Sequence, residues 1–477
     1  MSCTTILVGK EASYDGSCMI ARNDDSGAGH YTPKKFVVVE PEMQPRKYES
    51  VISHVRIDLP DDPMRYTAMP NAVAGKGTWA AAGVNAANVS MTATETITSN
   101  ALVLGADPLV VYDPETGTPG GIGEEDIVVI TLPYIHTARE GVERLGALTE
   151  KYGTYEMNGI GFSDVDEVWW FESIGGHHWM ARRLPDNSYA VIPNQLGLDT
   201  FDFDDAYGDK ENYMCSPDLK EFVEKNHLDL NLDGKFDPRL AFGSHEDADY
   251  VYNTPRAWYV ETQLNPSTAD KITPTSDNIP WCRVPERKIT VEDVKWLLSS
   301  HFQRTPYDPY TTGPEAGKYR TIGINRTAFL SVSQMRPANN TIEWIAFAAN
   351  PFNVLVPYYS DVKTLPDYVG DTTGTVSTNS FYWTSRLIAA MADASIKTSQ
   401  IVIERYQNSV AAKAHAILNK YDPQIAAAAD DDTRMRLREK ANEEITVMVQ
   451  SEADDALDKV LYNLSNDMKD AFSRSDA

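Results

Sequence analysis

Residues 3–25 read CTTILVGKEASYDGSCMIARNDD, and we expect the rest of the chain to be organised around this stretch. Residues 4–9 are β-branched and apolar, which favours a strand that begins at the cysteine. Residues 14–16, Tyr-Asp-Gly, are a turn signal, and residues 17–22 have the composition of a returning strand. The stretch therefore predicts a β-hairpin at the start of the chain.

The register of this hairpin decides which side chains meet. A tight two-residue turn would place Arg22 opposite Gly9, far from the cysteine. A longer loop over residues 11–16 would place Arg22 opposite Thr5 and bring the carboxylates that follow it to the level of Cys3. We expect the second register, because a thiol, a guanidinium and two carboxylates then converge at one end of the hairpin.

Cys3 admits two interpretations. In the first it is a small buried apolar residue on a first strand. In the second it is an N-terminal nucleophile, exposed when Met1 and Ser2 are removed. A freed α-amino group has a pKa of about 7.7–8.0, so it can act as the general base for its own side chain without a histidine. Arg22 would favour the thiolate, and Asp25 would hold the ammonium and the arginine in place.

Composition and charge exclude several classes of function. The 477 residues are 42% hydrophobic and 10% aromatic, which is ordinary for a globular protein with ample core-forming material. The formal net charge is −26, and the isoelectric point is about 4.7. Nucleic acids and anionic membranes both require basic surface, so neither is expected as a partner.

Cysteine usage and the N-terminus suggest a compartment. The four cysteines, at positions 3, 18, 215 and 282, show neither a disulfide framework nor CxxC zinc spacing. The first residues lack the basic and apolar regions of a signal peptide, and no run approaches the roughly 18 apolar residues of a membrane span. A soluble cytoplasmic protein is therefore expected.

Two motifs carry a resemblance to a known family. Cys-Thr-Thr at residues 3–5, followed by Ala-Arg-Asn-Asp-Asp at residues 21–25, resembles the cysteine dipeptidases among the N-terminal nucleophile hydrolases, of the lactobacillar dipeptidase A type. Bile salt hydrolases and penicillin V acylases are more distant members of the same group. The resemblance extends from Cys3 to about Trp383.

The resemblance implies a fold and a domain organisation. The implied fold class is α+β, the four-layer αββα sandwich of the N-terminal nucleophile hydrolases, with insertions and a helical C-terminal region. The pattern of the residues alone indicates only a mixture of helices and strands. Residues 1–2 would be a short leader removed on maturation, and residues 3–400 the hydrolase domain. Residues 401–477 would be a helical extension packed on that domain.

The resemblance also implies a set of site residues. Residues 191–196, Val-Ile-Pro-Asn-Gln-Leu, resemble a segment whose asparagine donates its side-chain amide to the oxyanion, so Asn194 is expected to take that role. Arg256, within residues 252–258, is expected to face the nucleophile pocket. Glu95 stands where the acylases carry a pocket asparagine, and its carboxylate suits a substrate ammonium group and not an oxyanion. A turn-forming asparagine, a surface arginine and a surface glutamate are the structural alternatives.

The implied reaction is hydrolysis of a dipeptide by acyl transfer. Cys3 attacks the scissile carbonyl, while Asn194 and a backbone N–H group stabilise the oxyanion. The side chains of Arg22, Asp25 and Arg256 set the charge around the nucleophile. The resemblance implies no metal ion and no organic cofactor.

Two alternatives stay open. One is a related amide hydrolase, of the bile salt hydrolase or penicillin V acylase type, which Glu95 disfavours because a carboxylate suits an ammonium better than a steroid or phenoxyacyl group. The other is a catalytically silent protein that acts through interactions, as secernin-like proteins do. For the enzyme, dipeptides are the expected partners, and assembly into homo-oligomers stays open.

The middle of the chain is expected to be rich in strands. Residues 158–194 have the pattern of a four-stranded β-meander. Within it, residues 177–178 are two adjacent histidines, which point to opposite faces of a strand and so cannot readily chelate one ion. Residues 201–250 are acidic and are expected to form a looped insertion. Residues 229–234 match the first half of a calcium loop, but Leu240 replaces the glutamate required at its last position.

The last third of the chain is expected to be mostly helical. Residues 291–301 favour a helix, and residues 351–359 a loop beside the pocket. Residues 382–421 favour a long helical region that ends at residues 422–423, Asp-Pro. Residues 424–472 then carry apolar side chains at helical spacing, for packing or assembly.

Overall fold

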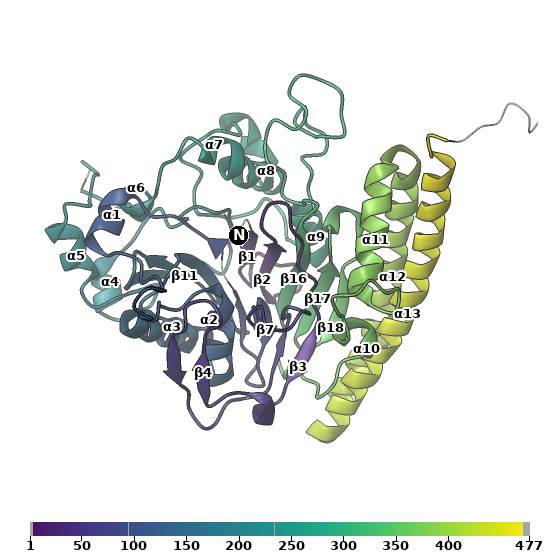
Figure 1. Ribbon diagram of the computed structural model, residues 1–477, viewed down its shortest axis with the longest axis horizontal. Helices are drawn as coiled ribbons and strands as arrows, with labels where there is room; N and C mark the ends of the chain where they lie inside the picture. The colour runs from purple at the N-terminus through teal and green to yellow at the C-terminus, as the bar shows by residue number, and fades with distance from the viewer. Residues whose placement is uncertain (1–2, 94, 233, 471–477) are drawn as a thin grey trace, which may run out of the picture.

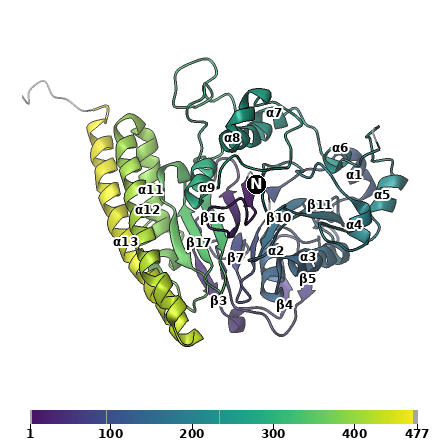
Figure 2. The same cartoon turned by 180° about the vertical axis from the view of Figure 1, so that it is seen from behind.

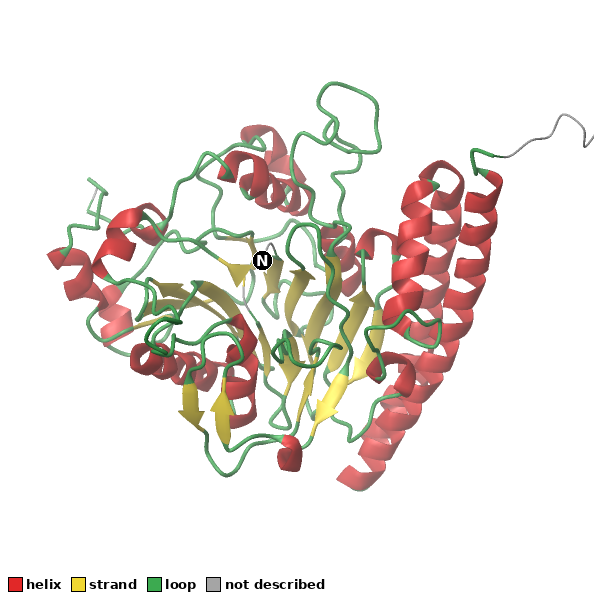
Figure 3. Ribbon diagram, viewed as in Figure 1, coloured by secondary structure: helices red, strands yellow, loops and turns green. Residues whose placement is uncertain are grey.

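The computed structural model describes residues 3–93, 95–232 and 234–470, which form a mixed α+β structure with two principal sheets (Figures 1 and 3). The first sheet is antiparallel and has the N-terminal hairpin at its centre. Its strands, in spatial order, are β15 (Cys282–Arg283), β13 (Tyr189–Ile192), β1 (Thr4–Val8), β2 (Cys18–Asp25), β16 (Thr327–Met335), β17 (Ile342–Phe347) and β18 (Val356–Tyr359).

The second sheet is also antiparallel. Its strands, in spatial order, are β14 (Tyr213–Cys215), β12 (His178–Arg183), β11 (Val168–Ile174), β10 (Asn158–Ser163), β8 (Ser90–Thr92) and β7 (Ala82–Val84), and β9 (Glu95–Thr96) also pairs with β10. Two small ribbons complete the β structure: β3 (Val37–Val39) pairs with β6 (Tyr66–Ala68), and β4 (Lys47–Glu49) pairs with β5 (Arg56–Asp58).

The hairpin register predicted from the sequence is confirmed. Arg22 lies opposite Thr5, and Asn23 lies opposite Thr4. The connection is a loop and not a two-residue turn, and Asp15 holds it by accepting hydrogen bonds from the backbone and side chain of Ser17 at 3.1 and 2.6 Å. The basic side chain of β2 is thereby carried to the end of the hairpin at which Cys3 lies.

The predicted four-stranded meander is wrong at its last strand. β10, β11 and β12 follow one another in the second sheet, but β13 crosses to the first sheet and pairs with β1. The loop before β13 packs onto Gly9, whose N–H donates to the Ser188 carbonyl at 2.9 Å. A Cβ at Gly9 would lie 2.4 Å from the Asp186 carbonyl oxygen, so glycine permits the crossing.

Alternation along the central strands creates separate apolar cores. Leu7 and Ile20 belong to the core between the two sheets, with Trp170 and Met180 of the second sheet. Their neighbours Ile6 and Met19 belong to a core on the opposite face of the first sheet. A third core joins the second sheet to the helices that cover it. Because successive side chains in a strand point to opposite faces, a hairpin that is buried on both faces can contribute to two cores at once.

Helices cover the outer faces of both sheets. The helix α3 packs on the second sheet, while α9 packs on the central strands of the first, and α11, α12 and α13 pack beside β17 and β18 (Figures 1 and 2). The helices are α1 (Ala101–Ala106), α2 (Glu124–Thr131), α3 (Ala138–Tyr152), α4 (Phe203–Tyr207), α5 (Leu219–Lys225), α6 (Pro238–Phe242), α7 (Asp249–Tyr252), α8 (Thr254–Leu264), α9 (Val291–Leu298), α10 (Asp367–Gly370), α11 (Phe381–Ala394), α12 (Ile396–Ala427) and α13 (Asp431–Asn466).

The predicted helix end at residues 422–423 is wrong, because α12 continues through Pro423 to Ala427. A proline inside a helix removes one backbone hydrogen bond and costs about 3 kcal/mol. Tertiary contacts hold this part of α12. The Asp422 carboxylate accepts from Arg336 at 2.6 Å and from the Tyr359 hydroxyl at 2.7 Å, which ties the helix to β18 and to the residue that follows β16.

Two segments predicted as loops contain regular structure. Residues 351–359 include the edge strand β18, whose alternation is hidden by the proline within it. Residues 201–250 contain β14 and the short helices α4 to α7, and their apolar side chains join the core between the sheets. These elements depend on long-range packing, which local composition does not reveal.

Candidate active site

Cys3 lies immediately before β1 and is completely buried. Its sulfur accepts a hydrogen bond from Arg22 Nη2 at 3.0 Å, as the hairpin register requires. Burial raises the pKa of the Cys3 thiol to about 12, although the Arg22 guanidinium opposes the shift. A thiol with this pKa is neutral near pH 7. In the full sequence Ser2 precedes Cys3, so the backbone nitrogen of Cys3 is an amide and not an amine.

The Arg22 guanidinium is buried and shared among several acceptors. Besides the Cys3 sulfur, Nη2 contacts Glu124 Oε1 at 2.6 Å and Asp24 Oδ1 at 3.5 Å. Nη1 donates to the Ala81 carbonyl at 3.1 Å. Hydrogen bonds between charged partners are stronger than neutral ones, so Glu124 provides the firmest of these contacts.

A second buried arginine holds the backbone of the cysteine. Arg256, in the first turn of α8, donates from Nη1 to the Cys3 carbonyl oxygen and, at 2.7 Å, to Thr4 Oγ1. Its Nη2 donates to Asn194 Oδ1 at 2.8 Å and to Asn253 Oδ1 at 2.6 Å. Burial lowers the pKa of the Arg256 guanidinium from its ordinary value. These contacts join Asn194 to the cysteine through one side chain.

Asn194 follows β13 and connects the two sheets. Its Nδ2 group donates to Glu95 Oε1 at 2.9 Å and to the Thr96 carbonyl at 3.0 Å. Glu95 is fully buried, and its other oxygen accepts from Thr5 Oγ1 at 2.9 Å. Burial raises the pKa of the Glu95 carboxyl, while Arg256 opposes the shift. Both N–H groups of the Asn194 amide therefore have partners within the protein.

Asp25 was expected to hold Arg22, but its carboxylate contacts other groups. Oδ2 pairs with Arg320 at 2.5 Å, and Oδ1 accepts from Thr327 Oγ1 at 2.6 Å. Arg22 and Asp25 are three positions apart on β2, so they lie on opposite faces of the first sheet. The neighbouring Asp24 shares the face of Arg22 and makes the contact instead.

A strained backbone segment passes beside Arg22. Trp79 and Ala81 have φ angles of 48° and 66°, a region that costs energy for residues with a Cβ. The buried Lys34 donates to the Trp79 carbonyl at 3.0 Å and pairs with Asp24 at 3.1 Å. Arg22 holds the Ala81 carbonyl in the same way. Two buried cations thus fix the strained segment and meet the same carboxylate.

Glu124 and Lys34 were not expected in this cluster, and Asp24 was expected near Cys3 but was assigned no role. Asp24 carried a usable signal, because residues two apart on a strand share a face. Glu124 carried none, since acidic residues at the start of an apolar helix are ordinary complements of the helix dipole. Lys34 lies in a loop before β3, and nothing local connects it to the cysteine.

The arrangement suits nucleophilic catalysis by a thiol. Cys3 has a guanidinium at hydrogen-bond distance, which stabilises the thiolate, and the buried surroundings exclude water. The cluster that contacts Arg22 and Arg256 contains no histidine among the described residues. Residues 1–2, which are expected to form a removable leader, lie outside the part of the chain described.

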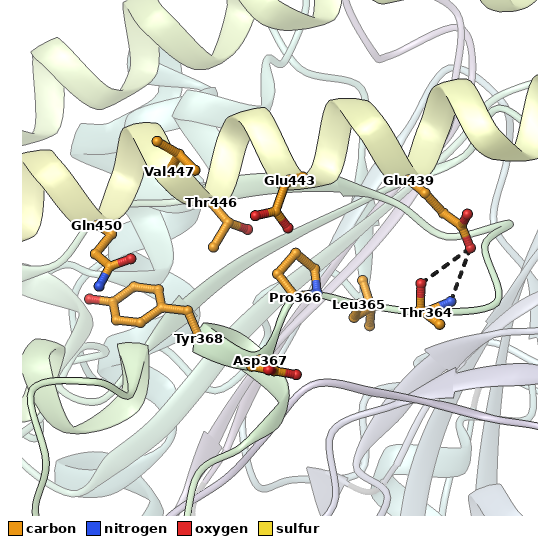
Figure 4. Close-up of a pocket in the computed structure, with 10 residues that line it drawn as sticks. All are labelled: Thr364, Leu365, Pro366, Asp367, Tyr368, Glu439, Glu443, Thr446, Val447 and Gln450. Carbon is orange, nitrogen blue, oxygen red and sulfur yellow. Dashed lines mark hydrogen bonds between the residues drawn. The ribbon is translucent and has the colours of Figure 1, made fainter.

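Two sizeable cavities lie away from this cluster. A cavity of about 450 Å³ separates residues 364–368 from α13, and in it Glu439 accepts from the backbone and hydroxyl of Thr364 at 3.2 and 3.3 Å (Figure 4). A cavity of about 390 Å³ is bordered by α11 and by residues 321–325. Cys3 lines neither, so we place the candidate active site at the buried cluster.

The two adjacent histidines are tied to one carboxylate. His177 Nδ1 and His178 Nδ1 contact the two oxygens of Asp107 at 3.0 and 2.7 Å. The His177 side chain is 45% exposed and that of His178 only 14%, so one histidine is exposed and the other is packed. His178 also stacks on Phe222 of α5, so the pair anchors the 201–250 segment.

Neither a metal-binding cluster nor a membrane-spanning helix is found in the described residues. Those residues include no group of three or more His, Cys, Asp and Glu side chains placed to hold a metal ion. Asp229 accepts from the Asn231 backbone at 3.0 Å in an Asx turn, and Asp233 of the half calcium loop lies outside the described residues. Within the same residues, every helix is too short or too polar to cross a membrane.

Comparison with known proteins places the chain in a family. Residues 2–409 match peptidase family C69. The chain is 51% identical to a protein named dipeptidase from Bifidobacterium longum, over the full length of both chains. It is 51% identical to a probable dipeptidase A from Streptococcus pyogenes, over 100% of this chain and 98% of that one. It is 45% identical to dipeptidase A from Lactobacillus helveticus, over 89% and 88% of the two chains. The chain therefore belongs to peptidase family C69.

Proposed function

We propose that this protein is a dipeptidase that uses Cys3 as an N-terminal nucleophile. The observation that carries the proposal is the 3.0 Å contact between the Cys3 sulfur, at the start of the first strand, and the buried Arg22 guanidinium. The names of the relatives, dipeptidase and dipeptidase A, support dipeptides as the substrate class.

The proposal includes the four-layer αββα fold of the N-terminal nucleophile hydrolases. Two antiparallel sheets that share one apolar core, each covered by helices on its outer face, support it. In this organisation residues 1–2 are the leader, residues 3–400 the hydrolase domain and residues 401–477 the helical extension packed upon it.

Maturation would supply the general base. When Met1 and Ser2 are removed, the Cys3 nitrogen becomes an α-amine with an ordinary pKa of about 7.7–8.0. The neutral amine takes the thiol proton, and Arg22 stabilises the thiolate that results. The thiolate attacks the dipeptide carbonyl carbon, and the carbonyl oxygen becomes the oxyanion.

Asn194 and a backbone N–H group would stabilise this oxyanion. Because Nδ2 of Asn194 donates to Glu95 and to the Thr96 carbonyl, one of those hydrogen bonds must be exchanged for the one to the oxyanion. The α-ammonium of Cys3 then gives its proton to the leaving amine as the C–N bond breaks. Water, deprotonated by the same amine, hydrolyses the thioester and releases the acyl half as a free amino acid.

The leader provides a decisive test. A variant with an uncleavable residue before Cys3 retains the thiol but converts its amine into an amide, which is no base near pH 7. We expect dipeptide hydrolysis to collapse in this variant, while intact-mass spectrometry of the active wild type shows Cys3 as the first residue. Normal turnover by the extended protein would refute the mechanism. Turnover of N-acylated amino acids in place of dipeptides would instead support a related acylase.

A further inference from the structure

Glu124 contacts the arginine of the nucleophile and has no role in the reaction outlined above. Its side chain is 3% exposed, and its Oε1 lies 2.6 Å from Arg22 Nη2, the same nitrogen that donates to the Cys3 sulfur at 3.0 Å. Arg22 Nε has no hydrogen-bond partner, so the orientation of the guanidinium depends on its two terminal nitrogens. The Glu124 contact is the shortest of those that fix it.

The position of Glu124 is itself fixed by its surroundings. It is the first residue of α2, and its backbone N–H donates to Glu156 Oε1 at 2.8 Å. The next residue, Glu125, accepts from the Val51 backbone N–H at 2.7 Å, and Asp126 accepts from the Tyr48 hydroxyl at 2.6 Å. The start of the helix is thus anchored by its neighbours, and the Glu124 carboxylate is presented to Arg22 from a rigid element.

The charge and the geometry of Glu124 act on the thiol in opposite directions. As an acceptor it holds Arg22 against the sulfur, which favours the thiolate. As a negative charge close to the sulfur it disfavours the thiolate. The other charged groups around the sulfur, from the elements packed about it, are Arg22 and Asp24 of β2, Glu95 of β9, Arg256 of α8 and Lys34 of the loop before β3.

We propose that Glu124 is a positioning residue for the reaction: it fixes the Arg22 guanidinium against the Cys3 sulfur and tunes how readily that sulfur loses its proton. The inference rests on the proposed function, in which Cys3 is the nucleophile. It adds to that function a residue of α2, one of the helices that pack on the second sheet. No local sequence signal connects Glu124 to the site.

Two substitutions separate the charge from the geometry. Glu124→Gln keeps an acceptor oxygen for Arg22 but removes the charge, so the thiol should ionise at a lower pH. Glu124→Ala removes both, so Arg22 is free to turn away and the thiol should ionise at a higher pH. Glu125→Gln is the matched control, because Glu125 is equally buried one residue along the same helix and contacts Val51, Ile52 and Ser50.

The measurement is the rate of Cys3 alkylation by iodoacetamide as a function of pH, followed for that residue by peptide mass spectrometry. Intact-mass spectra show whether each preparation begins at Met1, Ser2 or Cys3, so that only preparations with the same first residue are compared. We expect the midpoint for Glu124→Gln to fall by about one pH unit and the midpoint for Glu124→Ala to rise, with Glu125→Gln unchanged. For Glu124→Ala, kcat for dipeptides should fall on the order of 100-fold with little change in KM.

Equal midpoints in wild type and Glu124→Gln, or an equal shift in Glu125→Gln, would overturn the inference. If Glu124→Ala does not fold, the Glu124→Gln midpoint decides the question alone. Labelling needs no turnover, so failure of the proposed function is distinguishable: Cys3 would then be labelled with the expected shifts while no variant, wild type included, hydrolyses dipeptides.

Discussion

Replacement of Asn194 by alanine tests the assignment of the oxyanion donor. The Asn194 side chain donates hydrogen bonds to Glu95 at 2.9 Å and to the Thr96 carbonyl at 3.0 Å, and it accepts one from Arg256 at 2.8 Å. Two of these partners are ionisable and buried, and a hydrogen bond to a charged group contributes about 1.5–3 kcal/mol. We therefore expect Asn194→Ala to lower the free energy of unfolding by roughly 3–5 kcal/mol, whether or not Asn194 acts in catalysis.

The catalytic role must be separated from this structural loss. Removal of one oxyanion donor typically lowers kcat by about 10²–10³-fold, because the lost hydrogen bond matters only in the transition state. Asn253→Ala is the matched control: Asn253 accepts from the same Arg256 nitrogen at 2.6 Å and donates to the Asn194 carbonyl at 3.1 Å, yet is assigned no oxyanion role.

Steady-state kinetics on a dipeptide, with the melting temperature of each variant, provide the assay. We expect Asn194→Ala to lose kcat with KM little changed, and Asn253→Ala to lose stability while kcat stays within a few-fold of wild type. The reasoning is refuted if Asn194→Ala retains kcat, or if the two variants lose kcat equally. In the second case Asn194 acts only by holding Arg256.

Two further predictions concern buried carboxyl groups. Glu95 can bind the substrate ammonium with the lone pairs that Thr5 and Asn194 leave free. If it does, Glu95→Gln should chiefly raise KM for dipeptides, and N-acetylated dipeptides should be poor substrates. Equal turnover of free and acetylated dipeptides would assign Glu95 a structural role. Glu343 is buried in β17 with Thr67 Oγ1 at 2.6 Å, and burial raises its pKa to about 8. The folded protein therefore retains a proton that the unfolded chain loses, so stability falls as pH rises from about 4.5 to about 8. Glu343→Gln should remove this contribution, at most a few kcal/mol, from the pH dependence of the free energy of unfolding. Chemical denaturation of the wild type and the variant at about pH 5 and pH 8 measures it. An equal change in the free energy of unfolding between the two pH values in both proteins would contradict the prediction.

Local sequence signals predicted the two strands of the hairpin but left two registers open. The longer loop was expected because it brings Cys3 and Arg22 together, and the structure has that pairing. Thr290 likewise begins α9 as an N-cap with Asp293 at the third position, a pattern set by residues three apart. Both features depend only on neighbours in the chain.

The partners of the site residues could not be predicted in the same way. Glu124 is 102 positions from Arg22, and only the tertiary fold brings the start of α2 to that side chain. The departure of β13 from the meander depends on an open edge at β1 and on the close approach at Gly9. Such contacts depend on packing between residues far apart in the sequence, so no local sequence pattern indicates them.

Several charged side chains are buried around Cys3, although burial of charged groups costs desolvation free energy. Within the described residues they include the basic side chains of Arg22, Lys34 and Arg256 and the acidic side chains of Asp24, Glu95 and Glu124. Buried ion pairs of this kind add little net stability, because desolvation of the ions offsets their attraction, whereas removal of one partner costs about 3–5 kcal/mol. The cluster is therefore better explained by the site it builds than by stability. In the proposed mechanism the α-amine freed by maturation must keep a pKa near its ordinary value of about 7.7–8.0, because only then can it accept the thiol proton near pH 7.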